Sequence, residues 1–199
     1  MKHLVTFLFS LTFIFHASAQ QVNPRWLNNK WEAQWIFSPE SVPAGPDVWH
    51  FRKTISLDSK PGSFIVHITA VNRYKLYVNG KFVGLGPARS DPKNWNFQTL
   101  DIAPYLTQGK NVVAAVVWNF GANAPMAEMP GRTLFLLQGN TIQEQMVNTD
   151  QSWKVMVNKA YQYAWPDLQT FHVVGPGENI DFNKFPEGWK ASILMIVSG

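Results

Sequence analysis

The stretch Asn72-Arg-Tyr-Lys-Leu-Tyr-Val-Asn-Gly-Lys-Phe-Val-Gly-Leu-Gly86 decides the fold of this chain. Asn79 and Gly80 lie between two alternating apolar segments. Both central residues of a type I′ turn need φ > 0, and Asn-Gly adopts this conformation readily, so the pattern predicts a two-residue β-hairpin. Tyr74, Leu76 and Val78 then share one face of the first strand. The centre of the chain is therefore predicted to form antiparallel β structure.

Further strand patterns flank the hairpin. Residues 64–70 alternate between apolar and mixed positions, whereas residues 112–117 are apolar throughout, which is typical of a central strand covered on both faces. Residues 133–138 and 153–157 also have strand patterns, and residues 101–106 are expected to form one helical turn with Pro104 early in it. The expected fold class is all-β: an antiparallel β-sandwich of the jelly-roll, galactose-binding-domain-like type.

The order of short motifs resembles the amino-terminal β-sandwich of bacterial α-L-rhamnosidases of glycoside hydrolase family 78 and their relatives. In that family a Tyr-x-Leu-Tyr-Val-Asn-Gly hairpin precedes Gly-Pro-x-Arg, Asp-x-x-x-Tyr-Leu and Gly-x-Asn-Val. Here these motifs occupy residues 74–80, 86–89, 101–106 and 109–112. Residues 35–36, 51–53 and 149–153 fit the same pattern, and the resemblance covers roughly residues 31–189.

The first 19 residues are typical of a secretory signal peptide. Lys2 and His3 precede a 12-residue apolar core, and Ala17-Ser18-Ala19 forms a small-residue cleavage site. The core is shorter than the about 20 residues needed to cross a bilayer, so we expect no membrane span after cleavage. A retained amino-terminal anchor is the alternative. The predicted location is periplasmic or secreted. The chain contains no cysteine, which excludes disulfides.

The rest of the chain is predicted to divide into three parts. Residues 20–30 are an extended lead-in, residues 31–189 form one β-sandwich, and residues 190–199 are an aberrant or truncated tail. The tail ends in the apolar run 193–197, where members of the resembled family continue with Asp-Ser-x-Trp. Freely chosen codons for this tail can encode that motif in another reading frame, so we expect a frameshifted or truncated fragment. The alternative is a genuine terminal strand.

Charge and motif content exclude several functions. Loss of Lys2 with the leader leaves 16 basic and 13 acidic residues, a net charge of +3 without a basic cluster, so no nucleic-acid partner is expected. The histidines outside the leader, His50, His67 and His172, lack metal-ligand spacing, and we expect His67 to be a half-buried or surface strand residue. There is no phosphate-binding loop. The resemblance implies that the catalytic acid lies in an (α/α)₆ barrel beyond this domain, so no catalytic residue and no metal ligand is assigned here.

Carbohydrate binding is the remaining function, because sugar sites combine aromatic faces with amides, carboxylates or Arg. Two loops have this composition, and they contain the candidate carbohydrate-binding residues Arg89, Asp91, Trp95, Asn96, Trp118 and Asn119. We favour Trp95, since the loop around it is long and polar, whereas Trp118 ends an apolar strand. Hydrophobic packing is the alternative role for both rings.

No cofactor is expected apart from calcium, which some sandwiches of the resembled family use to bind rhamnose. Asp91 or Asp101 are the candidate calcium ligands, although no run matches a calcium loop. The predicted function is that of a non-catalytic module, inactive by itself, of an α-L-rhamnosidase-like glycoside hydrolase, with carbohydrate and the remaining modules as partners. The alternatives are a free-standing lectin-like protein and the sandwich of a β-galactosidase-type glycosidase.

Overall fold

The computed structural model describes residues 22–28, 30–43, 45–91, 93–121, 124–126, 128, 131–164 and 175–190. The predicted leader, residues 191–199 of the predicted tail, His172, and Ala122 and Asn123 in the loop that follows the candidate residue Asn119 lie outside these ranges. In the described part of the chain, no helix has both the length and the apolarity that a membrane crossing requires.

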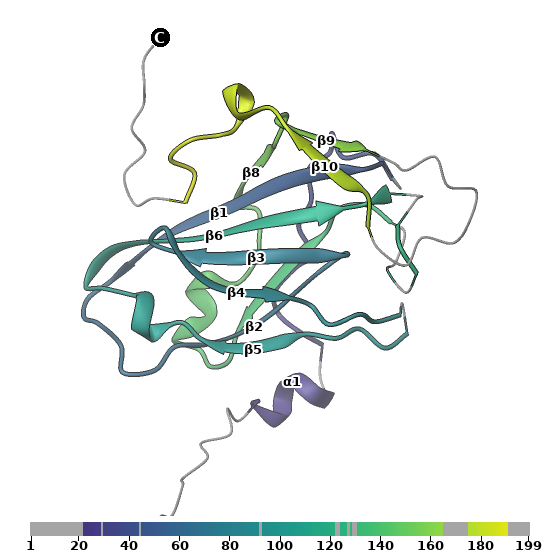
Figure 1. Cartoon of the computed structure of the whole chain (residues 1–199). Coiled ribbons are helices and arrows are strands. Elements are labelled where there is room, and N and C mark those ends of the chain that lie inside the picture. The colour runs from purple at the N-terminus through teal and green to yellow at the C-terminus, as the bar shows by residue number, and fades with distance from the viewer. Residues whose placement is uncertain are drawn as a thin grey trace, which may run out of the picture.

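Two antiparallel sheets face one another (Figure 1). The larger has the order β4-β3-β6-β1-β8, and the smaller has the order β5-β2-β7. A separate ribbon pairs β9 with β10. The strands are β1 (Asp47–Leu57), β2 (Ile65–Ala70), β3 (Arg73–Val78), β4 (Lys81–Gly86), β5 (Gln98–Asp101), β6 (Gly109–Asn119), β7 (Phe135–Gly139), β8 (Lys154–Val157), β9 (Tyr161–Ala164) and β10 (Gly177–Ile180). The expected all-β antiparallel sandwich is confirmed.

The hydrophobic core lies between the two sheets. Alternate residues of β1, β3 and β6 meet alternate residues of β2 and β7, and the rings of Phe51 and Phe135 stack across the interface with centroids 5.2 Å apart. The opposite face of β6 is also covered, partly by the β9–β10 ribbon and partly by Trp189. Strand β6 is thus buried on both faces, as its unbroken apolar sequence predicts.

The predicted hairpin joins β3 to β4. Asn79 and Gly80 have φ values of +50° and +80°, and Val78 pairs with Lys81 across the turn. The expected helical turn is also present as the 3₁₀ helix η1 (Ala103–Tyr105), with Pro104 within it. Gly86 ends β4 at a position where a Cβ would clash with the Gln98 side chain, which favours glycine there.

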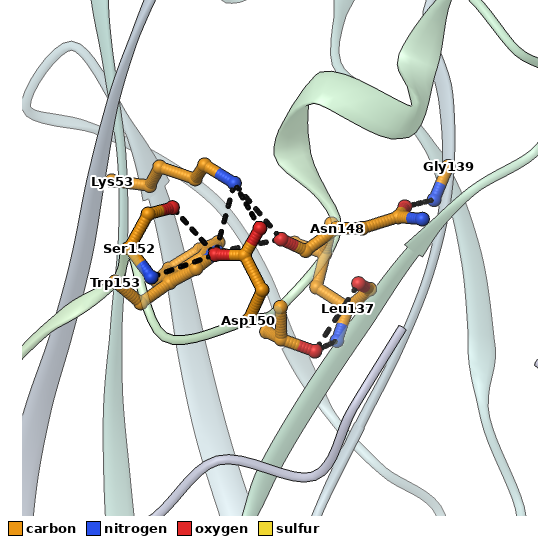
Figure 2. Close-up of polar contacts among 8 residues, drawn as sticks. Lys53, Leu137, Gly139, Asn148, Asp150, Ser152 and Trp153 are labelled. Carbon is orange, nitrogen blue, oxygen red and sulfur yellow. Dashed lines mark hydrogen bonds and ion pairs between the residues drawn. The ribbon is translucent and has the colours of Figure 1, made fainter. Parts of the chain in front are cut away.

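A polar corner ties β7 to the rest of the sandwich (Figure 2). We call residues 148–153 the 148–153 corner; the segment follows the 3₁₀ helix η3 (Glu144–Val147). Asn148 Oδ1 accepts a hydrogen bond from the Gly139 N–H at 2.7 Å, and the Asn148 carbonyl accepts from Lys53 Nζ and from the Trp153 indole N–H. Partial burial would raise the pKa of Asp150, but hydrogen bonds from Ser152 and Lys53 outweigh this and lower it. The corner is a structural clamp.

Two expectations differ from the structure. The segment 20–30, expected to be extended, contains the helix α1 (Pro24–Asn28), which begins after Asn23 accepts a hydrogen bond from the Arg25 N–H. His67, expected to be half-buried or at the surface, is fully buried. The reason is common to both: residues 23–36 cross the outer face of β2, where the Trp31 ring lies 6.0 Å from the His67 ring.

Candidate functional site

The polar loop between β4 and β5 contains four of the six predicted site residues. Asp91 accepts hydrogen bonds from the Lys93 N–H at 2.8 Å and the Asn94 N–H at 3.0 Å, and the Asn94 amide donates to the same carboxylate. These bonds, led by that of the Asn94 side chain, lower the pKa of Asp91. The Asn96 side chain donates to the Arg89 carbonyl at 2.7 Å. Much of the loop's polarity therefore stabilises the loop itself.

Trp95 is attached to the sheet by its indole N–H. Its Nε1 donates to Thr69 Oγ1 at 2.9 Å, and Thr69 Oγ1 in turn donates to the Asn96 carbonyl at 2.7 Å. The half-buried indole ring of Trp95 contacts the edge of Trp35, with centroids 5.0 Å apart. Trp95 is consequently held in one orientation, with part of its ring open to solvent.

A cleft of about 420 Å³ lies between this loop and the segment that crosses the smaller sheet. Figure 1 shows α1, at the start of that segment, on the side of the sandwich formed by β2 and β5. We call this space the aromatic cleft, and its lining residues are Trp26, Lys30, Trp31, Ala33, Trp35, Thr69, Trp95, Phe97 and Leu136. A space of this size is within the range of small-molecule sites.

The aromatic cleft depends on contacts that are remote in sequence. The Trp26 indole N–H donates to the Asn140 carbonyl at 2.8 Å, and Asn23 makes two further hydrogen bonds with Asn140. The Trp31 indole N–H donates to the Trp26 carbonyl, and the Trp31 ring packs edge-on against Phe97 at 5.0 Å. These bonds position the aromatic side chains of residues 26–35 over the smaller sheet.

The lining residues support binding more readily than catalysis. They include five aromatic side chains, one amine and no carboxylate. Glycoside hydrolysis usually requires two carboxylates on either side of the scissile bond. Aromatic faces, in contrast, bind the apolar C–H face of a sugar or another planar ring.

Trp118 and Asn119 lie in the other sheet, at the end of β6, and do not line the aromatic cleft. Trp118 is 8% exposed, contacts the edge of Tyr161 and has Lys75 Nζ 5.0 Å above its ring. Asn119 is fully buried: its amide donates to the Gly131 carbonyl, and its side-chain oxygen accepts from the Gly121 N–H. Both residues make structural contacts in these positions.

The candidate calcium ligands are separated. Asp101 caps the turn at η1, because its Oδ1 accepts from the N–H groups of Phe64 and Ala103. Asp91 is bonded within its own loop. Within the described ranges, no three His, Cys, Asp or Glu residues gather closely enough to hold a metal ion.

Most of the aromatic cleft differs from the predicted site. Trp26, Lys30, Trp31 and Phe97 are not among the predicted site residues, and Trp35 belongs only to a motif of the resembled family. The available signal was three tryptophans within ten residues, at positions 26, 31 and 35.

Comparison with known proteins identifies the domain. The family model described as "Alpha-L-rhamnosidase N-terminal domain" matches residues 59–194, more than half of the chain. The crystal structure of a family 78 rhamnosidase of Bacillus sp. GL1 superposes with a TM-score of 0.70 at 29% identity, over 81% of this chain and 17% of that chain. The resemblance expected from the motifs is confirmed.

Two further α-L-rhamnosidase structures share the fold. That from Dictyoglumus thermophilum has a TM-score of 0.58 at 21% identity, over 80% of this chain and 19% of its own. That from Aspergillus terreus has a TM-score of 0.55 at 22% identity, over 80% and 20%. The present chain therefore spans a fifth or less of the length of these proteins. No curated protein matches the chain in a sequence search.

Proposed function

Since the chain belongs to the α-L-rhamnosidase N-terminal domain family, we propose that it is a non-catalytic β-sandwich module of a secreted or periplasmic α-L-rhamnosidase-like glycoside hydrolase. We further propose that the module contacts carbohydrate through Trp95. The observation that carries the first proposal is the family match over residues 59–194. The same match favours a rhamnosidase module over the sandwich of a β-galactosidase-type enzyme.

The position of Trp95 supports the proposal for carbohydrate. Its ring is half-buried, fixed by Thr69, and opens into the aromatic cleft. Asn94 and Asn96 flank it and are exposed; their amide nitrogens are bonded within the loop, and their side-chain oxygens can accept from sugar hydroxyls. Arg89 and Asp91 complete the polar side of the loop.

A sugar titration tests this proposal. L-Rhamnose added to the full chain, with and without calcium, should shift the backbone N–H signals of the loop around Trp95 in NMR spectra with a dissociation constant on the order of 1 mM, because a monosaccharide makes few desolvated contacts. Trp95→Ala should weaken binding about fivefold or more. Phe182→Ala is the matched control, since Phe182 is 78% exposed and lies outside the aromatic cleft.

The outcome separates two roles. A saturable response that Trp95→Ala leaves unchanged would remove Trp95 from the site. No response to rhamnose would leave the module as a structural spacer next to the remaining modules of the enzyme. Export is tested separately by amino-terminal sequencing of the protein recovered outside the cytoplasm, which we expect to begin at Gln20.

A further inference from the structure

The aromatic cleft offers few hydrogen-bonding groups for a sugar. Of its lining residues, Lys30 and Thr69 carry polar side chains other than indoles. The Thr69 hydroxyl already accepts from Trp95 Nε1 and donates to the Asn96 carbonyl. The indole N–H groups of Trp26 and Trp31 are bonded to backbone carbonyls. Burying sugar hydroxyls inside the cleft without partners would cost free energy, so the proposed sugar contact is confined to the side of Trp95 that faces its own polar loop.

The ring arrangement suits a flat aromatic ligand. Trp35 and Trp95 meet edge to face at 5.0 Å, and Trp31 and Phe97 do the same. A planar ring inserted beside such pairs continues the edge-to-face or offset-stacked geometry that aromatic groups prefer. Trp35 is 37% exposed, so part of its surface is free for such a contact.

Lys30 gives the aromatic cleft a positive charge. Among the described residues, Lys30 takes part in no ion pair, whereas the nearby Glu32 is neutralised by Arg25 at 2.7 Å and also bonded to Gln145. The lining contains no carboxylate to offset the ammonium. An anionic group on the ligand would therefore find an unopposed charge next to the aromatic walls.

From these observations we propose that the aromatic cleft binds an aromatic carboxylate, with the flat ring against Trp35 and Trp95 and the carboxylate at Lys30. This inference goes beyond the proposed contact with sugar, because its ligand needs no hydroxyl recognition.

The test uses the full chain at low ionic strength, with 2-naphthoate as the probe and binding followed by indole N–H shifts in NMR spectra. We expect a dissociation constant on the order of 1 mM. Cyclohexanecarboxylate, which has the same charge without an aromatic ring, should bind at least fivefold more weakly. Neutral 2-naphthalenemethanol should bind about threefold to fivefold more weakly than 2-naphthoate.

Two variants assign the contacts. Trp35→Ala should weaken 2-naphthoate binding at least fivefold, and Phe182→Ala should leave it unchanged. Lys30→Met should abolish the preference of the chain for 2-naphthoate over 2-naphthalenemethanol. Because Lys30 is exposed, Lys30→Met should fold, and it tests the proposal even if Trp35→Ala fails to fold.

The remaining outcomes overturn the proposal. Equal binding of cyclohexanecarboxylate and 2-naphthoate would exclude recognition of the ring, and an unchanged preference in Lys30→Met would exclude the charge. Rhamnose binding without 2-naphthoate binding would refute this inference while leaving the proposed sugar contact intact. Binding of 2-naphthoate without rhamnose binding, in contrast, would support this inference and refute the proposed sugar contact.

Discussion

Asn79 connects three parts of the chain through one side-chain amide. Its Nδ2 donates to the Tyr105 carbonyl at 2.9 Å and to Asn111 Oδ1 at 2.7 Å, and its Oδ1 accepts from the Val112 N–H at 2.9 Å. Asn79 is also the first residue of the hairpin turn, with φ of +50°. The left-handed backbone conformation, which asparagine tolerates, thus places the amide where it joins the turn to η1 and β6.

Gly80, the second turn residue, tests the hairpin at the level of one residue. Its φ is +80°, and a Cβ there would meet no atom closer than the Lys190 carbonyl at 3.8 Å. Gly80→Val should therefore destabilise the fold by about 1–3 kcal/mol through backbone strain and not through a clash. Urea unfolding measures this effect. Gly80→Asn is the control and should cost much less; equal costs for the two variants would exclude the conformational explanation.

His50 should make the stability of the domain depend on pH. The Asn158 amide nitrogen lies 2.9 Å from His50 Nε2, so this ring nitrogen must accept, and Nδ1 has no partner among the described residues. Phe185 and Trp189 pack against the ring. Burial lowers the pKa of His50 to about 4, and the positive charge of Lys190 adds to this effect. The folded state thus holds the neutral imidazole.

Because the folded pKa of His50 lies below the unfolded value of about 6.5, its contribution to stability is complete above pH 6.5 and is lost as the pH falls towards 4. The loss between pH 7 and pH 5 should be about 2 kcal/mol, measured as the free energy of urea unfolding. His50→Gln should reduce this slope. Burial also lowers the pKa of His67, so a smaller slope of the same sign should remain. An identical slope in the variant and the wild type would contradict the assignment to His50.

At the level of the elements, the predictable parts are those whose signals are local. The turn residues Asn79 and Gly80 determine the β3–β4 hairpin, and the unbroken apolar sequence of β6 matches its place between β1 and β3. The segment over the smaller sheet gives no comparable signal, because Trp26 is held by Asn140, 114 residues away. The polar composition of the loop around Trp95 can be read from the sequence. The position of Trp31 and Trp35 on the other side of the aromatic cleft depends on the contact between Trp26 and Asn140 and cannot.

The 148–153 corner offers a test at this scale. Asn148→Ala removes the acceptor of the buried Gly139 N–H, whose hydrogen bond measures 2.7 Å, and should destabilise the domain by about 1–3 kcal/mol. Asn148→Asp keeps a side-chain oxygen in that position and is the matched control. The free energy of unfolding measures both effects. If Asn148→Ala were as stable as the wild type, the corner would not clamp β7.

At the scale of the whole molecule, the fold joins a covered core to the open aromatic cleft. The smaller sheet is buried on its inner face by the larger sheet and on its outer face by the segment that begins with α1. The buried His67 makes structural contacts there, since its ring nitrogens lie 2.9 Å from Thr99 Oγ1 and Asn140 Oδ1. The open part of that outer face is the aromatic cleft. Binding, where it occurs, is therefore expected on this side of the sandwich.

The final prediction concerns activity. The full chain should not hydrolyse 4-nitrophenyl α-L-rhamnoside above the buffer rate, because the lining of the aromatic cleft contains no carboxylate and the chain spans a fifth or less of the rhamnosidases that share its fold. Release of 4-nitrophenolate measures the rate. Hydrogen bonds from Asn94 and Lys93 lower the pKa of Asp91 and so stabilise the charged form of this carboxylate, which a general acid cannot use. Turnover that Asp91→Asn or Asp101→Asn abolished, in a variant that remains folded, would show that the module is itself a glycosidase.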